Sequence, residues 1–133
     1  MRNMNNGLEL ITNRSELITL CKLNMQASTQ AKQSGAWDEA LKYIRIENDM
    51  IFKSIPSCNA ELDNFDPWKD EELRDITSTV SLSCLFLEYL NRNASEGDKI
   101  FESIKGNGSK TDIAKASFIC GGVRQLYFSS LIL

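Results

Sequence analysis

The 133-residue chain contains no histidine, and its four cysteines form no Cys-x-x-Cys pair. Histidine is the side chain that most readily exchanges protons near neutral pH, so its absence removes the usual general acid or base of an enzyme. A zinc site would need histidines or closely spaced cysteines, and neither pattern is present. We therefore expect no enzymatic activity, no bound metal and no cofactor. Isolated, reduced thiols are typical of a cytoplasmic protein.

The sequence also has little that would attract a nucleic acid or a membrane. Its net charge is −3, and its 15 lysine and arginine residues are dispersed rather than gathered in a cationic stripe. No run of about 20 apolar residues could span a bilayer, and the first seven residues lack the apolar segment of a secretory signal. We expect a cytoplasmic protein with no direct nucleic-acid contact and no membrane insertion. The 42% hydrophobic and 25% charged content fits one helical-bundle domain over residues 1–133.

What the sequence does contain is the apolar periodicity of amphipathic helices. Ser34-Gly35 is a stop signal for a first helix, and Pro56 predicts the end of a second helix. Asp66-Pro67 is a start signal for a third helix, because aspartate caps free amides and proline suits the first helical position. We expect an all-α antiparallel bundle of three main helices, the third long, plus a short C-terminal helix. The expected ranges are about 8–32, 36–55, 66–105 and a short segment from Ser109 to Phe118.

The third of these helices carries the longest apolar seam in the chain. Its apolar residues recur in alternating steps of three and four, and the spacing keeps its phase across Gly97, which favours one helix over a break near Ser95-Glu96-Gly97. Such a seam needs cover, either from the first two helices or from a second copy of the chain. The seam consists of Leu73, Ile76, Val80, Leu87, Leu90, Ala94, Phe101 and Ile104.

The C-terminal segment, residues 121–133, is markedly apolar. It begins with Gly121-Gly122, a pair typical of a breaker or hinge, so we expect a hinged tail. One interpretation is an autoinhibitory tail that occupies a groove of the bundle when the groove is empty; the other is permanent packing in the core. The residues assigned to such a lid are Val123, Leu126, Tyr127 and Phe128.

The order of these elements resembles the flagellar protein FliT family. The residues that carry the resemblance are Trp37-Asp38 opening the second helix, the stretch from Leu87 to Arg92, and a polar turn followed by Ser109 to Phe118. The resemblance covers most of residues 8–118. It implies a cytoplasmic chaperone of flagellar type III export, whose last helix can cover a groove for the client.

The same resemblance implies the partners. The client would be an amphipathic segment of the secreted flagellar cap protein, and further contacts would be export ATPase components and the flagellar master regulator. An amphipathic client helix would lay its apolar face between bundle helices. The alternative is a self-associating helical structural or regulatory protein, such as a homodimer, without a secreted client. The residues predicted to bind a partner are Ile44, Ile51, Leu87, Leu90, Phe101 and Ile104.

Overall fold

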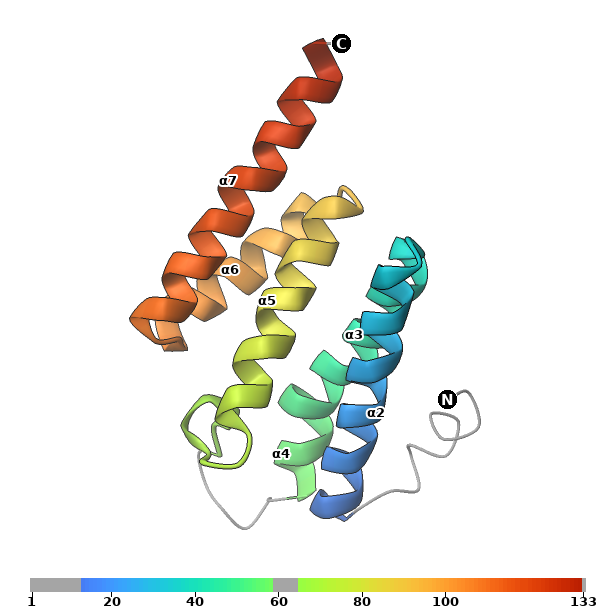
Figure 1. Cartoon of the computed structure of the whole chain (residues 1–133). Coiled ribbons are helices and arrows are strands. Elements are labelled where there is room, and N and C mark those ends of the chain that lie inside the picture. Colours follow the sequence, from blue (N-terminus) through green and yellow to red (C-terminus); the bar gives the residue numbers. More distant parts are fainter. Residues whose placement is uncertain (1–12, 59–64, 133) are drawn as a thin grey trace.

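A computed structural model of the chain describes residues 13–58 and 65–132, apart from the side chains of Cys58 and of residues 123–132. These described ranges are mostly helical and contain no strand (Figure 1), so the predicted all-α bundle is confirmed. Residues 8–12, predicted to begin the first helix, lie outside the described part. The elements are α2 (Arg14–Gln33), α3 (Trp37–Asp49), the π-helix η2 (Met50–Ser54), α4 (Ile55–Cys58), the 3-10 turn η3 (Pro67–Lys69), α5 (Arg74–Leu90), α6 (Ala94–Asn107) and α7 (Lys110–Ile132).

Helices α2 and α3 form an antiparallel hairpin. The predicted stop at Ser34-Gly35 is confirmed, and Gly35 has a φ of 78°, a left-handed conformation that glycine adopts without steric cost. The two helices are also joined by a buried hydrogen bond, in which the Ser28 hydroxyl donates to the carbonyl of Ala40 at 3.0 Å. The turn thus brings the end of α2 beside the start of α3.

The prediction that Pro56 ends the second helix is wrong. After α3 the chain widens into the π-helix η2, in which the Ile55 amide donates to the carbonyl of Met50, five residues earlier. A π-turn inserts one extra residue into the helical course. This wider turn gives the ring of Pro56 room that a regular α-helix would not leave, so helical structure continues into α4.

The predicted long helix over 66–105 is also wrong, because the chain turns between α5 and α6. Arg92 takes the left-handed conformation, with a φ of 66°, and its amide donates to the carbonyl of Tyr89. The amide of Asn93 donates to the carbonyl of Glu88 at 2.8 Å. This pair of hydrogen bonds is the Schellman arrangement that closes a helix, here without its usual glycine. The break lies before the predicted alternative at Ser95–Gly97.

Asp66 does cap a helical segment, although not the predicted long helix. Its side chain accepts from the amide of Trp68 at 3.0 Å and so starts the 3-10 turn η3. Asp70 caps the turn that leads into α5, because its carboxylate accepts from the amides of Glu72 and Leu73. Two capped turns therefore replace one helix start.

The last helix is longer than predicted. The expected capping box is confirmed: the Asp112 amide donates to the Ser109 hydroxyl at 3.1 Å, and the Ser109 amide donates to the Asp112 carboxylate at 2.9 Å. Helix α7 then runs for 23 residues through Gly121-Gly122, which permit a break without requiring one. Its C-terminal half projects past the ends of α5 and α6 (Figure 1).

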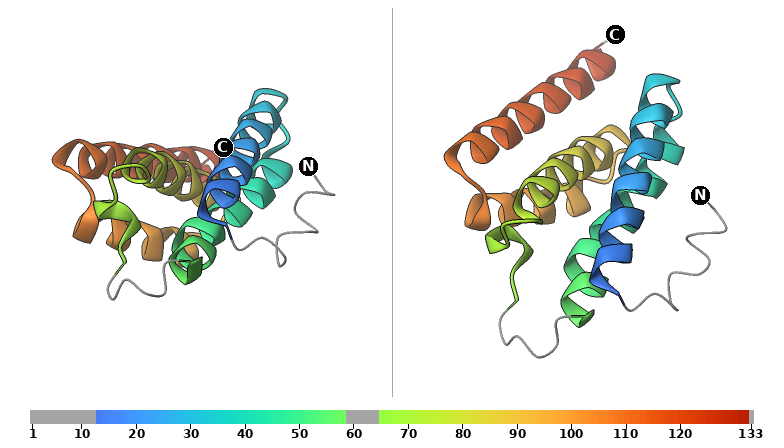
Figure 2. Two further views of the ribbon diagram at one scale, coloured as in Figure 1. Left: turned by 90° about the horizontal axis from the view of Figure 1, so that it is seen from below. Right: turned by 60° about the horizontal axis from the view of Figure 1, so that its bottom comes forward.

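The helices pack around α5. Helix α3 lies against one side of α5, while α6 and α7 lie against the others, and α2 packs mainly on α3 (Figure 2). A first core cluster joins α2, α3 and α5, and a second joins α5, α6 and α7. The buried members of the first are Cys21, Ala40, Leu41, Ile44, Ile51, Val80, Cys84 and Leu87, and those of the second are Trp68, Leu85, Tyr89, Ile104 and Ala116.

Candidate partner-binding groove

Most of the residues predicted to bind a partner lie in the core. The predicted stripe faces neighbouring helices of the same chain, which already bury it. Leu90 and Phe101 are half-buried, at the edge of the bundle. The structure assigns the other four residues to core packing and not to an exposed surface; they are Ile44 (1% exposed), Ile51 (0%), Leu87 (0%) and Ile104 (0%).

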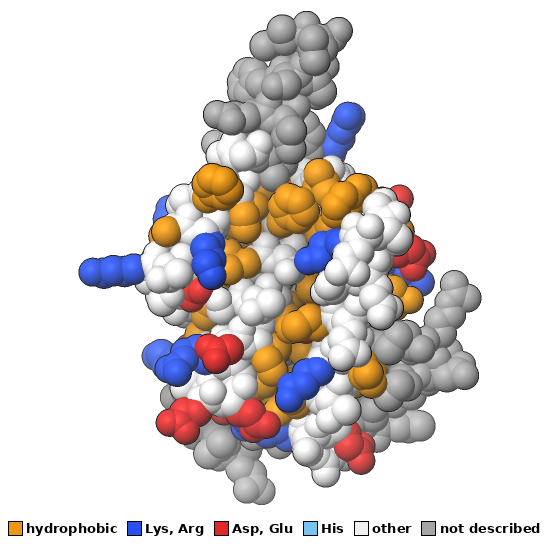
Figure 3. All heavy atoms as spheres, in the orientation of Figure 1, with side chains coloured by type: hydrophobic (Ala, Val, Ile, Leu, Met, Phe, Trp, Pro, Cys, Tyr) orange, Lys and Arg blue, Asp and Glu red, His pale blue; other side chains and the backbone are white. Residues whose placement is uncertain are grey.

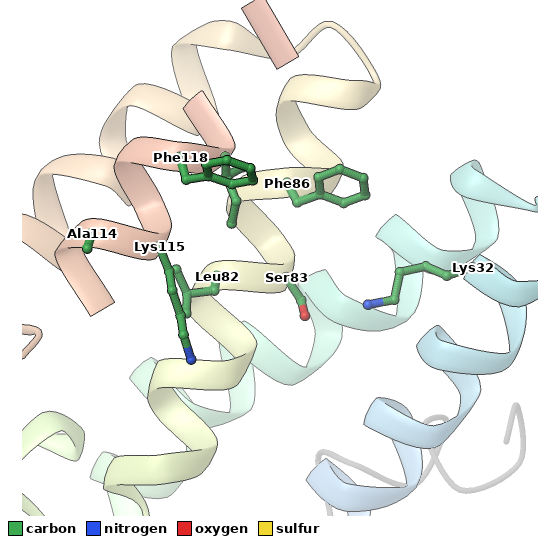
Figure 4. A pocket seen from close by; sticks show the side chains of 8 residues that line it. Lys32, Leu82, Ser83, Phe86, Ala114, Lys115 and Phe118 are labelled. Carbon is green, nitrogen blue, oxygen red and sulfur yellow. The ribbon is translucent and has the colours of Figure 1, made fainter. Parts of the chain in front are cut away.

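An apolar groove lies elsewhere, between α7, α5 and the end of α2. It encloses about 550 Å³. Figure 3 shows hydrophobic side chains gathered on this face of the molecule, with cationic side chains around them. The groove is lined by Lys32, Leu82, Ser83, Phe86, Ala114, Lys115, Phe118 and Ile119, most of which are labelled in Figure 4.

The floor of the groove comes from α5. Leu82 and Phe86 are four residues apart, so they share one face of the helix, and both are half-buried. This face differs from the one that carries the predicted seam, because Val80 and Leu87 point into the core. Helix α5 is therefore apolar on more than one side, and α6 and α7 cover only part of the additional surface.

The wall of the groove comes from α7. Phe118 is 81% exposed, the most exposed large hydrophobic side chain among the described residues. Ile119, the next residue, is half-buried against the second core cluster. Sequence reasoning missed both the floor and the wall; the available signal was the i, i+4 pair of Leu82 and Phe86 outside the seam.

Two lysines lie on opposite sides of the groove. Lys32 extends from α2 toward α5, and Lys115 belongs to α7 (Figure 4). None of the described residues that line the groove is an aspartate or a glutamate. Neither lysine takes part in any ion pair found within the described ranges. The groove thus combines an apolar floor with two cationic edges.

A second hollow lies past the end of α2. It is lined by residues 35–39 together with Leu90 and Asn91. Trp37, 39% exposed, meets the ring of Phe86 edge to face, with ring centroids 6.2 Å apart. Phe86 lines the groove and Trp37 lines the second hollow, so this aromatic pair lies between the two hollows. The second hollow is acidic, because Asp38 and Glu39 line it.

A buried carboxyl lies between α2 and α3. Glu47 is fully buried, and the Cys21 thiol donates to its Oε1 at 3.6 Å, whereas no group of the described residues is hydrogen-bonded to its Oε2. Burial raises the pKa of Glu47 to about 8, although the Cys21 hydrogen bond and the charge of Lys32 oppose the shift. Burial also raises the pKa of the Cys21 thiol, which keeps it in the unreactive protonated form.

Within the described ranges, no group of three or more histidine, cysteine, aspartate or glutamate side chains is placed to hold a metal ion. In the same part of the chain, no helix is long and apolar enough to cross a membrane. The structure does not describe the side chains of the predicted lid, so their role stays a prediction; these residues are Val123, Leu126, Tyr127 and Phe128.

Comparisons with protein-family models, curated proteins and solved structures find no match for this chain. The resemblance to the FliT family therefore stays a prediction from the residues that carry it.

Proposed function

We propose that this chain is a helix-binding chaperone or adaptor that holds an amphipathic helix of a partner protein in the groove between α2, α5 and α7. The observation that carries the proposal is the apolar groove with Phe118 exposed on its wall. Grooves of this kind accept the apolar face of a helix, whose side chains at i, i+3, i+4 and i+7 fill the hollow.

The energetics favour an occupant. Full burial of a phenylalanine side chain is worth roughly 1.5–3 kcal/mol, and Phe118 leaves most of its surface in water. Leu82 and Phe86 add half-buried surface beside it. A partner that covers these three side chains gains an aromatic anchor at the centre of its contact, which is where binding energy concentrates in protein interfaces.

The resemblance to the FliT family makes the flagellar cap protein the client to test, within a role as a cytoplasmic type III export chaperone. Export ATPase components and the flagellar master regulator are the further partners of this proposal. Residues 123–133 would act as the autoinhibitory lid. The lid would have to leave its position beyond the bundle by bending at Gly121-Gly122, where no side chain opposes the change.

The experiment is co-purification from the native host with the full-length chain and with residues 1–120, combined with the mass in solution. The proposal expects the cap protein to be retained, and to be retained better by the truncated chain. Unchanged or weaker retention by a folded truncation would remove the lid from the account. Absence of the cap protein in both preparations would contradict the proposed client.

The second candidate is self-association without a client. It is favoured by the C-terminal half of α7, which is apolar in sequence and projects beyond the other helices (Figure 1). A homodimer could cover this segment and the groove together. A homodimer of defined mass, with no protein bound to it, would make this second candidate the better account.

A further inference from the structure

The three helices that border the groove begin at the same end of the bundle. Arg14, at the start of α2, pairs with Asp70, just before α5, at 2.8 Å. Ser78, near the start of α5, donates to Asp112, in the first turn of α7, at 2.5 Å. Helices α2, α5 and α7 therefore run in one direction along the groove, whereas α3 and α6 run against α5 (Figures 1 and 2).

The groove and the second hollow differ in the charges of the side chains that line them. The second hollow is lined by the carboxylates of Asp38 and Glu39, in the first turn of α3. The groove is lined by Lys115, in the second turn of α7, whereas Asp112 in the first turn lies outside the lining and is bound by Ser78. The positive N-terminal end of a docked helix is favoured beside the two carboxylates. A helix dipole laid along the groove is therefore favoured in one direction.

We propose, on the basis of the function proposed above, that the occupant is a helix of another protein that lies antiparallel to α5. Its N-terminal end lies at the hollow of Asp38 and Glu39. Acidic side chains flank its apolar stripe on both sides and face Lys32 and Lys115. The opposite direction would place the positive end of the ligand helix beside Lys115 and its negative end beside two carboxylates.

The length of the contact follows from α5. From Leu82 to Leu90 the helix rises ~12 Å, which corresponds to about two turns of a docked helix. Trp37 packs on Phe86 within this span, so a ligand helix that covers this aromatic pair reaches both hollows. A ligand helix with three or four apolar residues on one face would cover it.

The charge pattern also distinguishes this occupant from the chain's own tail. Residues 121–133 contain one basic residue, Arg124, and no acidic residue. A tail of this composition offers no carboxylate side chain to Lys32 or Lys115 and adds a third positive charge. A partner helix with acidic flanks would therefore displace the tail of the same chain or of a second copy.

The test uses two synthetic helical peptides of about 18 residues with capped ends and an identical leucine stripe. One peptide has glutamate on both flanks, and the other has lysine. We expect the glutamate peptide to bind more tightly. Lys32→Glu and Lys115→Glu should each weaken its binding by about fivefold, the upper range for an exposed ion pair. Lys22→Glu and Lys110→Glu, at exposed positions outside the groove lining, are the matched controls.

Direction is measured with a nitroxide at either end of the glutamate peptide. Trp37 and Trp68 give two indole N–H resonances in the full chain, and Trp68, 6% exposed, serves as the reference. The N-terminal label should broaden the Trp37 resonance selectively, whereas the C-terminal label should leave it sharp.

Broadening of Trp37 by the C-terminal label, or tighter binding of the lysine peptide, would overturn this inference. If Phe118→Glu still abolishes binding in either case, the proposed helix-binding function survives. If neither peptide binds in a way that depends on Phe118, both the inference and the proposed function fail.

Discussion

Two glycines of α6 should respond in opposite ways to the same substitution. An added Cβ at Gly97 would lie 2.8, 2.9 and 3.0 Å from three ring atoms of Tyr89, closer than packed carbons approach. The ring cannot easily move, because Tyr89 is 4% exposed and its hydroxyl is hydrogen-bonded to Asp98. An added Cβ at Gly106 would meet no atom of the described residues within 4 Å.

The magnitudes follow from these contacts. Overpacking costs roughly 1–3 kcal/mol, while exchanging glycine for alanine inside a helix gains about 1 kcal/mol. Gly97→Ala should therefore lower the free energy of unfolding by about 1 kcal/mol. Gly106→Ala should raise it by about 0.5 kcal/mol, since Gly106 lies in the last turn, where helix propensity counts for less.

Urea denaturation of the two variants beside the wild type is the assay, with both free energies taken at the same temperature. The informative quantity is the sign of the difference in free energy of unfolding between Gly97→Ala and Gly106→Ala, because each variant serves as the control for the other. If Gly97→Ala were as stable as Gly106→Ala, the close packing of α6 on Tyr89 would be refuted.

Three further changes test the core. Arg45→Ala should lower the free energy of unfolding, measured by urea denaturation, by about 1–3 kcal/mol. The reason is that Glu88, whose side chain is 4% exposed, would lose its two-point ion pair with Arg45. An unchanged free energy of unfolding would refute the stabilising role of this ion pair. Since the pKa of Glu47 is raised to about 8, the folded state holds a proton that the unfolded state releases, so stability should fall from about pH 4.5 to 8. Glu47→Gln should remove this dependence of stability on pH, which melting curves recorded at a series of pH values would measure. An equal fall of stability with pH in the variant and the wild type would contradict the prediction. Ile44→Ala should lower the free energy of unfolding by about 2–5 kcal/mol, because Ile44 is buried. Near-wild-type stability together with lost partner binding would instead place Ile44 in an interface.

The fold class followed from the sequence because apolar periodicity and capping residues act locally. Ser34-Gly35 and the capping box at Ser109 need only a few neighbouring residues to form, and both appear where they were predicted. The long apolar seam was equally visible. Four of its residues are buried by other helices of the chain, whereas Ala94 is exposed; the buried four are Leu73, Val80, Leu87 and Ile104.

The position of the helix breaks could not be predicted in the same way. Arg92 closes α5 in a left-handed conformation that is rare outside glycine, and the bonds from its neighbours to the end of α5 stabilise it. Conversely, Pro56 and Gly121-Gly122 signal breaks that do not occur, because a π-turn accommodates the proline and glycine only permits a turn.

The groove could not be predicted from the sequence for a related reason. A seam predicts which residues are apolar, but whether a neighbouring helix covers them depends on the tertiary arrangement. Because the chain turns between α5 and α6, three helices pack on different sides of α5: α3, α6 and α7. The surface of Leu82 and Phe86 then remains open beside Phe118, while Ile44 and Leu87 are enclosed.

The most direct test of the account is the affinity of the purified flagellar cap protein for the wild type, Phe118→Glu and Ser117→Glu, measured by calorimetry. Both substitutions add one negative charge at an exposed position of α7, but only Phe118 lines the groove. The account predicts at least about thirtyfold weaker binding for Phe118→Glu, the loss of an aromatic anchor, with little change for Ser117→Glu. Equal affinity of the folded Phe118→Glu variant and the wild type would contradict it.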